Sequence, residues 1–118
     1  MVVELLSKNY TEIRHTPVGA VPAGTMTLIN DTYGFPITDI AAGIEGTFII
    51  KAEKVRCPKQ APEVQAEGEN AYWDSAVNDN VTNVVGANFL IGTFQRDALS
   101  ADTTTILAFD GREAFLKA

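Results

Sequence analysis

The sequence is dominated by β-branched residues, which are interrupted at short intervals by glycine and proline. Thr, Val and Ile together number 31, against seven Leu. β-branched side chains are stiff at χ1 and fit the pleated surface of a strand. Nine glycines and five prolines divide the chain into pieces that are too short for ordinary helices. We therefore predict an all-β fold, a small barrel or sandwich.

The length of 118 residues suits a single domain of about eight short strands. The predicted strands cover residues 10–16, 25–30, 35–40, 46–57, 70–74, 81–85, 87–94 and 103–110. Asp31 to Gly34 is expected to form a turn. Pro36 has no N–H to donate, so the strand over residues 35–40 should lie at a sheet edge or contribute only partly. We expect residues 1–9 to be an extended N-terminal arm, 10–111 the β-rich domain, and 112–118 a C-terminal tail.

The longest strand signal, residues 46–57, has a break in its alternation. Val55 and Cys57 are out of phase with Phe48 and Ile50. A β-bulge near residues 53–54 would turn them back toward the core. A strand that simply leaves the core at that point would give the same pattern, and both interpretations stay open.

Residues able to perform catalysis are scarce. The only histidine, His15, lies between Arg14 and Thr16, and the only cysteine, Cys57, has no second cysteine or histidine near it in the sequence. One Cys and one His cannot supply the four ligands of a structural zinc site. The oxygen-rich run from Asp74 to Asn80 lacks the ligand spacing of an EF-hand and is typical of turns. We predict a protein that is not an enzyme and has no metal or cofactor.

The net charge of −6, from nine basic and fifteen acidic residues, argues against binding to phosphate backbones or anionic membranes. A lone cysteine allows no internal disulfide, and no long apolar run or basic leader is present. We expect a chain made in a reducing cytoplasm, with no nucleic-acid or membrane partner.

The second half of the chain contains short motifs in a characteristic order. A glycine–acid pair at 68–69 is followed by YWD at 72–74, VT at 81–82, GANFLIG at 86–92 and TTTILAF at 103–109. This order resembles the small capsid cement (decoration) proteins of tailed bacteriophages. The resemblance covers residues 43–111 and is strongest from Gly68. Its motif residues are Gly68, Tyr72, Trp73, Asp74, Gly86, Asn88 and Gly92.

Each motif residue also has a physical role that can be stated from its type. Gly68 and Gly92 suit positions of positive φ or close backbone approach. Trp73 would supply a large apolar block for a small core, and Asp74 would begin a turn.

The resemblance implies a β-rich structural protein that binds the outer surface of a phage capsid and stabilises the shell against internal DNA pressure. Its implied partner is the major capsid protein, and its implied state on the capsid is a homo-oligomer, with a trimer favoured. Its location would be the virion, on the outer capsid surface, after synthesis in the bacterial host cytoplasm. The alternative is a virion-surface module that binds glycans, with Tyr33, Phe35 and Tyr72 as candidate rings for stacking on sugar.

Both ends of the chain are apolar and could join it to a neighbour, by adding a strand or by packing across an interface. They could equally cap their own domain. The loop 58–67 is a second candidate surface. The candidate interface residues are Val2, Val3, Leu5, Leu6, Phe115 and Leu116.

Overall fold

A computed structural model describes residues 3–60, 62–74, 80–86 and 88–112. These residues contain nine strands and no α-helix, which confirms the all-β prediction. No helix in this part of the chain is long and apolar enough to cross a bilayer. The strands are β1 (Glu4–Leu5), β2 (Tyr10–His15), β3 (Thr27–Ile29), β4 (Thr32–Gly34), β5 (Gly46–Pro58), β6 (Asn70–Asp74), β7 (Asn80–Thr82), β8 (Phe89–Phe94) and β9 (Thr104–Asp110).

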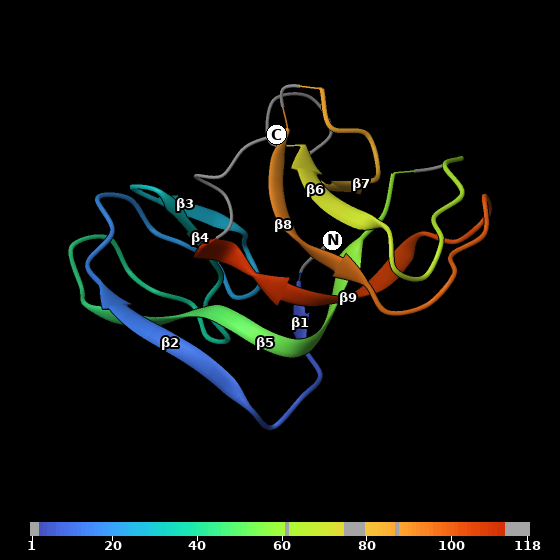
Figure 1. The fold of residues 1–118 in the computed structure, drawn as a ribbon. Helices are drawn as coiled ribbons and strands as arrows, with labels where there is room; N and C mark the ends of the chain where they lie inside the picture. Colours follow the sequence, from blue (N-terminus) through green and yellow to red (C-terminus); the bar gives the residue numbers. More distant parts are fainter. Residues whose placement is uncertain (1–2, 61, 75–79, 87, 113–118) are drawn as a thin grey trace.

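Seven of these strands form one antiparallel sheet in the order β1-β5-β9-β8-β6-β7, with β2 also paired to β5 (Figure 1). Immediately after β5, Lys59 forms a parallel bridge with Val81 of β7. The Gln60 N–H donates to the Val81 carbonyl at 3.0 Å. The sheet thus returns to the end of β5 and closes into a small barrel. This closure covers the edge that β7 would otherwise expose.

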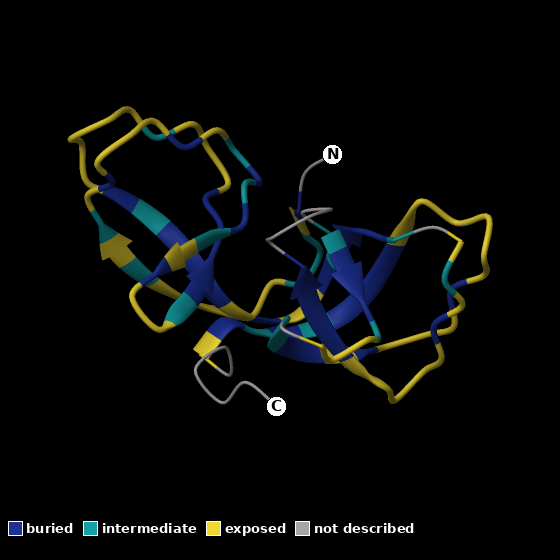
Figure 2. Cartoon of the chain, turned by 90° about the horizontal axis from the view of Figure 1, so that it is seen from above, coloured by how far each residue is buried: buried dark blue, intermediate teal, exposed yellow. Residues whose placement is uncertain are grey.

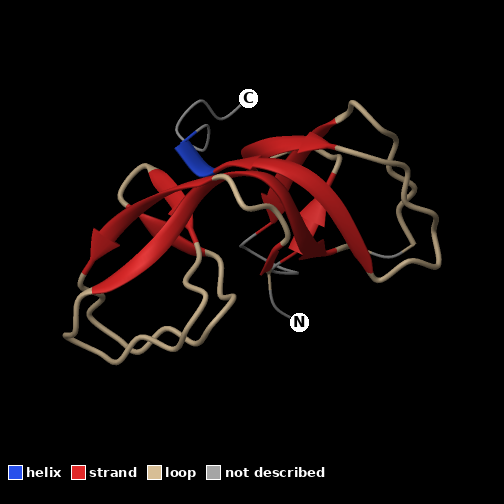
Figure 3. Ribbon diagram, turned by 90° about the horizontal axis from the view of Figure 1, so that it is seen from below, coloured by secondary structure: helices blue, strands red, loops and turns tan. Residues whose placement is uncertain are grey.

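The long strand β5 passes through both lobes of the molecule (Figures 2 and 3). Its second half belongs to the barrel lobe, which also contains β6 to β9. Its first half belongs to a smaller lobe with β2, the β3–β4 hairpin and the loops 16–26 and 36–45. Phe48 and Ile49 lie on opposite faces of β5, and both are fully buried. Ile49 packs in the large core cluster, and Phe48 packs in the small one.

The bulge interpretation of β5 is confirmed. Ala52 pairs with Phe109 and Val55 pairs with Leu107, so two residues of β5 oppose the single residue Ala108 of β9. The extra residue restores the inward direction, and Val55 and Cys57 are fully buried.

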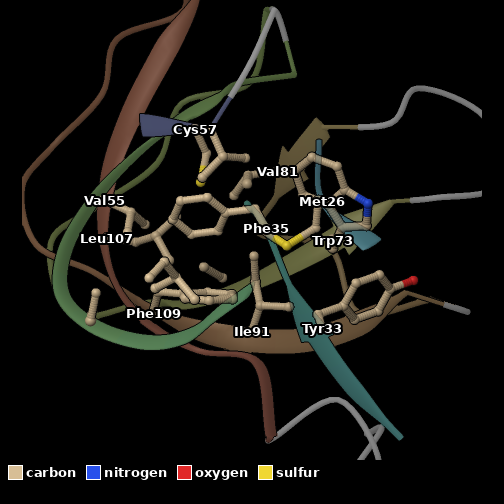
Figure 4. Packing of buried hydrophobic residues seen from close by; sticks show 14 of the residues in the cluster. Met26, Tyr33, Phe35, Val55, Cys57, Trp73, Val81, Ile91, Leu107 and Phe109 are labelled. Carbon is tan, nitrogen blue, oxygen red and sulfur yellow. The ribbon is translucent and has the colours of Figure 1, made fainter. Parts of the chain in front are cut away.

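The core has one large and one small cluster. The large cluster fills the barrel lobe and reaches under the β3–β4 hairpin (Figure 4). In it, the rings of Phe35 and Phe109 lie 5.7 Å apart in a tilted arrangement, which aromatic pairs favour. The small cluster consists of Val21, Ile29 and Phe48, with Ile13 and Ile40 packed against it.

The prediction was wrong in two local places. Residues 32–34, expected to lie in a turn, form β4, because the reversal occurs one step earlier at Asn30, whose φ is +56°. Residues 83–85, expected to continue the strand that begins at Val81, lie outside β7, which ends at Thr82. Residues 35–40 contribute isolated bridges at Phe35 and Ile40, which is the partial contribution expected as the alternative to an edge strand. Pro36 cannot donate to a ladder, and this accounts for the interruption.

Candidate functional site

The N-terminal segment packs onto its own domain over the residues that the structure describes. Val3 is only 4% exposed, lies in the large core cluster and donates its N–H to the Gly24 carbonyl at 2.8 Å. Leu5 is half-buried against the same cluster, and Leu6 donates its N–H to Lys54 at 3.0 Å. Within the expected arm, residues 4–5 therefore form β1 on the edge of β5. Contact of these residues with a neighbouring chain stays a prediction.

The C-terminal candidates Phe115 and Leu116, like Val2, lie outside the described residues. The last described turn is fixed by Gly111, which lies so close to the Tyr33 carbonyl that a Cβ would overlap it. Val3 and Gly111 both pack on the segment of residues 24–33.

Apolar side chains are exposed at the tip of the small lobe. Val18 is fully exposed and Ile44 is 59% exposed. The two loops that carry them are tied together by a 2.8 Å bond from the Gly43 N–H to the Pro17 carbonyl. Paired exposed apolar groups on adjacent loops are suited to contact with another macromolecule. Sequence reasoning missed this tip, because exposure of Val18 depends on how the two loops meet.

The carboxylate of Glu63 connects the loop 58–67 to β7 and to the residue that follows it. Glu63 accepts hydrogen bonds from Gln65 Nε2 at 2.8 Å, from the Asn83 N–H at 2.7 Å and from Thr82 Oγ1 at 2.6 Å. Gln65 is fully buried, and its Nε2 also donates to the Val81 carbonyl at 3.2 Å. The loop is thus an ordered surface. Its fastening was not foreseen, because Glu63 and Thr82 are 19 residues apart with no spacing signal between them.

The motif glycines Gly68 and Gly92 have positions that suit glycine. Gly68 has a φ of +88°, where a Cβ is strained, and its N–H donates to the Phe94 carbonyl at 2.9 Å. Gly92 lies directly against the carbonyl oxygen of Ala108, and a Cβ there would overlap that oxygen.

The other motif residues belong to β6 and to the turn before β8. Tyr72, Trp73 and Asp74 are all buried in β6. The turn that Asp74 was expected to begin lies outside the described residues. Gly86 has a φ of +40°, and Asn88 Nδ2 closes the turn by donating to the Val84 carbonyl at 2.9 Å.

The two residues examined for catalysis lie in packing environments. The Cys57 side chain is fully buried, and desolvation raises the pKa of its thiol above the ordinary value. The His15 ring meets the edge of Phe48 at 5.4 Å. Among the described residues no group of three His, Cys, Asp or Glu side chains is placed to hold a metal ion.

The aromatic rings considered for sugar stacking are buried. Tyr33 is 2% exposed, Phe35 is inaccessible and Tyr72 is 7% exposed. Tyr33 packs on Phe89 at 5.6 Å, and Phe35 packs on Phe109. These three rings therefore form part of the protein interior, and none offers an open face to a glycan.

The sequence model of a family described as "Phage cement protein" matches residues 7–108. This chain belongs to the phage cement protein family. No curated protein and no solved structure matches it.

Membership gives the cement protein a structural role associated with the phage capsid. The match includes β2 to β8 and most of β9, so it covers both lobes and the order of motifs from YWD through all but the last residue of TTTILAF.

Proposed function

We propose that this cement protein binds the outer surface of the assembled phage shell through the major capsid protein and stabilises the shell against the pressure of packaged DNA. The observation that carries the proposal is the family match over residues 7–108. The net charge of −6 agrees with it, because a charged surface keeps the protein soluble in the host cytoplasm before it meets the shell. On the capsid the protein is a homo-oligomer, with a trimer favoured by the resemblance.

Two surfaces are proposed to contact the shell. The first is formed by the two chain ends, with Val2, Phe115 and Leu116 as contact residues. Val3, Leu5 and Leu6 join the N-terminal end to the fold. Its support is that the described ends pack on the same segment, residues 24–33. The second is the apolar tip with Val18 and Ile44, whose side chains are mostly or fully exposed. Burial of such side chains against a shell would contribute roughly 1.5–3 kcal/mol each.

The function is tested by mixing the full chain with undecorated shells built from the major capsid protein of the same virus. Co-sedimentation of the chain with the shells is expected, together with a higher temperature of shell disruption. Electron microscopy of decorated and bare shells then gives the site and the number of copies at it. Absence of co-sedimentation, or bound chain with no change in shell stability, would contradict the proposal.

Variants separate the two surfaces. Val18→Ser with Ile44→Ser tests the tip, and Phe115→Ser with Leu116→Ser tests the C-terminal end. Leu99→Ser is the matched control, because Leu99 is 66% exposed and lies on the loop between β8 and β9, outside the residues of both proposed surfaces. Weaker shell binding by a surface variant, with the unfolding temperature unchanged, supports that surface. A surface whose variant binds like Leu99→Ser is not part of the contact.

A further inference from the structure

The strand β2 has one open edge. On its inner edge it pairs with β5 from Tyr10 to His15. On its outer edge, no backbone group of these six residues has a partner among the described residues. Figure 1 shows β2 at the margin of the small lobe, with no segment beyond it. An edge of this length is a template for another strand.

The hydrogen bonds of β5 show which groups of β2 face outward. Ile49 uses both its N–H and its C=O on Phe35, at 2.8 and 3.1 Å, on the side of β5 away from β2. Backbone groups alternate in direction along a strand, so those of Phe48 face β2 and meet Ile13, its register partner. The N–H and C=O groups of Glu12 and Arg14 therefore face outward and are free for a further strand.

We propose that β2 pairs with β2 of a second copy in antiparallel register, about a two-fold axis at Ile13. In that register Ile13 faces Ile13 of the other copy as the non-hydrogen-bonded pair, with their Cα atoms about 4.5 Å apart. Glu12 faces Arg14 of the other copy on both sides of the axis. The outward groups of these residues supply four backbone hydrogen bonds.

The side chains favour a second copy over an unrelated strand. Glu12 and Arg14 are both exposed, and opposite charges directly across a strand pair are stabilising. The existing partner of Arg14 is Glu45 at 3.5 Å, and both side chains are mostly exposed, so this ion pair competes weakly. The sequence Glu12-Ile13-Arg14 is thus self-complementary when it runs antiparallel to itself.

The small core cluster gives a second reason to expect β2 to pair with a second copy. It contains only three buried residues, and Ile13 lies at its edge, half-buried against Phe48. Pairing about Ile13 brings two such clusters together and covers the apolar edge of each.

The contact has two-fold symmetry, so on a shell it joins copies from different trimers. It does not depend on capsid binding and can be measured in the free protein.

The test is disulfide formation between copies of the full chain that carry Ile13→Cys. Cα atoms about 4.5 Å apart lie within disulfide range. The native Cys57 is fully buried and does not compete. Thr11→Cys is the matched control, because in the proposed register the two Thr11 residues are about 13 Å apart along the strands. We expect covalent dimer from Ile13→Cys and not from Thr11→Cys. Equal yields from the two variants, or no dimer from Ile13→Cys, would overturn the proposal.

Charge reversal provides a second measurement in the Ile13→Cys background. Glu12→Arg or Arg14→Glu alone places like charges opposite each other, and the rate of dimer formation should fall about fivefold. The two changes together restore opposite charges and should return the rate to its starting value. Failure of the double variant to recover overturns the register, even if each single variant is slow. Shell binding by the same variants is scored separately.

Discussion

The Thr82 hydroxyl donates a 2.6 Å hydrogen bond to Oε2 of Glu63, and this contact joins β7 to a loop that precedes it by 19 residues. The other carboxylate oxygen accepts from the Asn83 N–H and from Gln65 Nε2. Three donors therefore converge on one side chain. The loop 58–67 is fixed beside the closure of the barrel, and its outer surface is presented in one arrangement.

Glu63→Gln should lower the free energy of unfolding by about 1–3 kcal/mol. The amide has only one acceptor oxygen, and its NH2 group would face a donor that the second carboxylate oxygen now accepts from. Glu67→Gln is the matched control, since Glu67 is exposed and no side-chain contact of it is seen among the described residues. Urea unfolding of the two variants measures the difference. Similar midpoints for both would show that the carboxylate does not hold the loop.

Gly92→Ala should be among the most destabilising small substitutions in the barrel. A Cβ at Gly92 overlaps the Ala108 carbonyl, so β8 and β9 must separate at their pairing, at a cost of about 1–3 kcal/mol. Gly19→Ala meets no atom within 4 Å and should leave stability unchanged or slightly raised. Thermal unfolding followed by circular dichroism compares the two. A Gly92→Ala protein that melts with Gly19→Ala would contradict the close approach of these strands.

Val3→Ala should cost about 1–2.5 kcal/mol, because it removes two methyl groups from a buried position. The neighbouring Glu4→Gln removes only an exposed ion pair with Arg56, 3.3 Å long, and should change stability by less than about 1 kcal/mol. Equilibrium unfolding in urea gives both values. If the two variants were equally stable, the N-terminal segment would not be part of the folded domain.

The sequence predicted best where the relevant signal was local. The out-of-phase Val55 and Cys57 located the irregularity of β5 and left two interpretations, a bulge or a strand that leaves the core, of which the structure has the bulge. The pairing of residues 4–5 with β5, and the fastening of the loop by Glu63, depend on partners far away in the chain. Period-2 patterns specify faces and not partners, so these contacts had no signal in the sequence.

The buried thiol of Cys57 predicts a specific dependence of stability on alkaline pH. Burial raises the pKa of this thiol in the folded chain, whereas the unfolded chain has the ordinary value of about 8.5. Below that value both states hold the proton and pH has no effect through this group. Above it only the unfolded state ionises, so the free energy of unfolding should fall by up to about 1.4 kcal/mol per pH unit.

Cys57→Ala should lose this slope, although the cavity lowers its stability at every pH. Urea unfolding at several pH values from 7 to 10 compares the two proteins, with Ellman's reagent as a check: the thiol should react only after unfolding. Parallel pH profiles, or rapid reaction in the native state, would show that Cys57 is not sealed in the barrel.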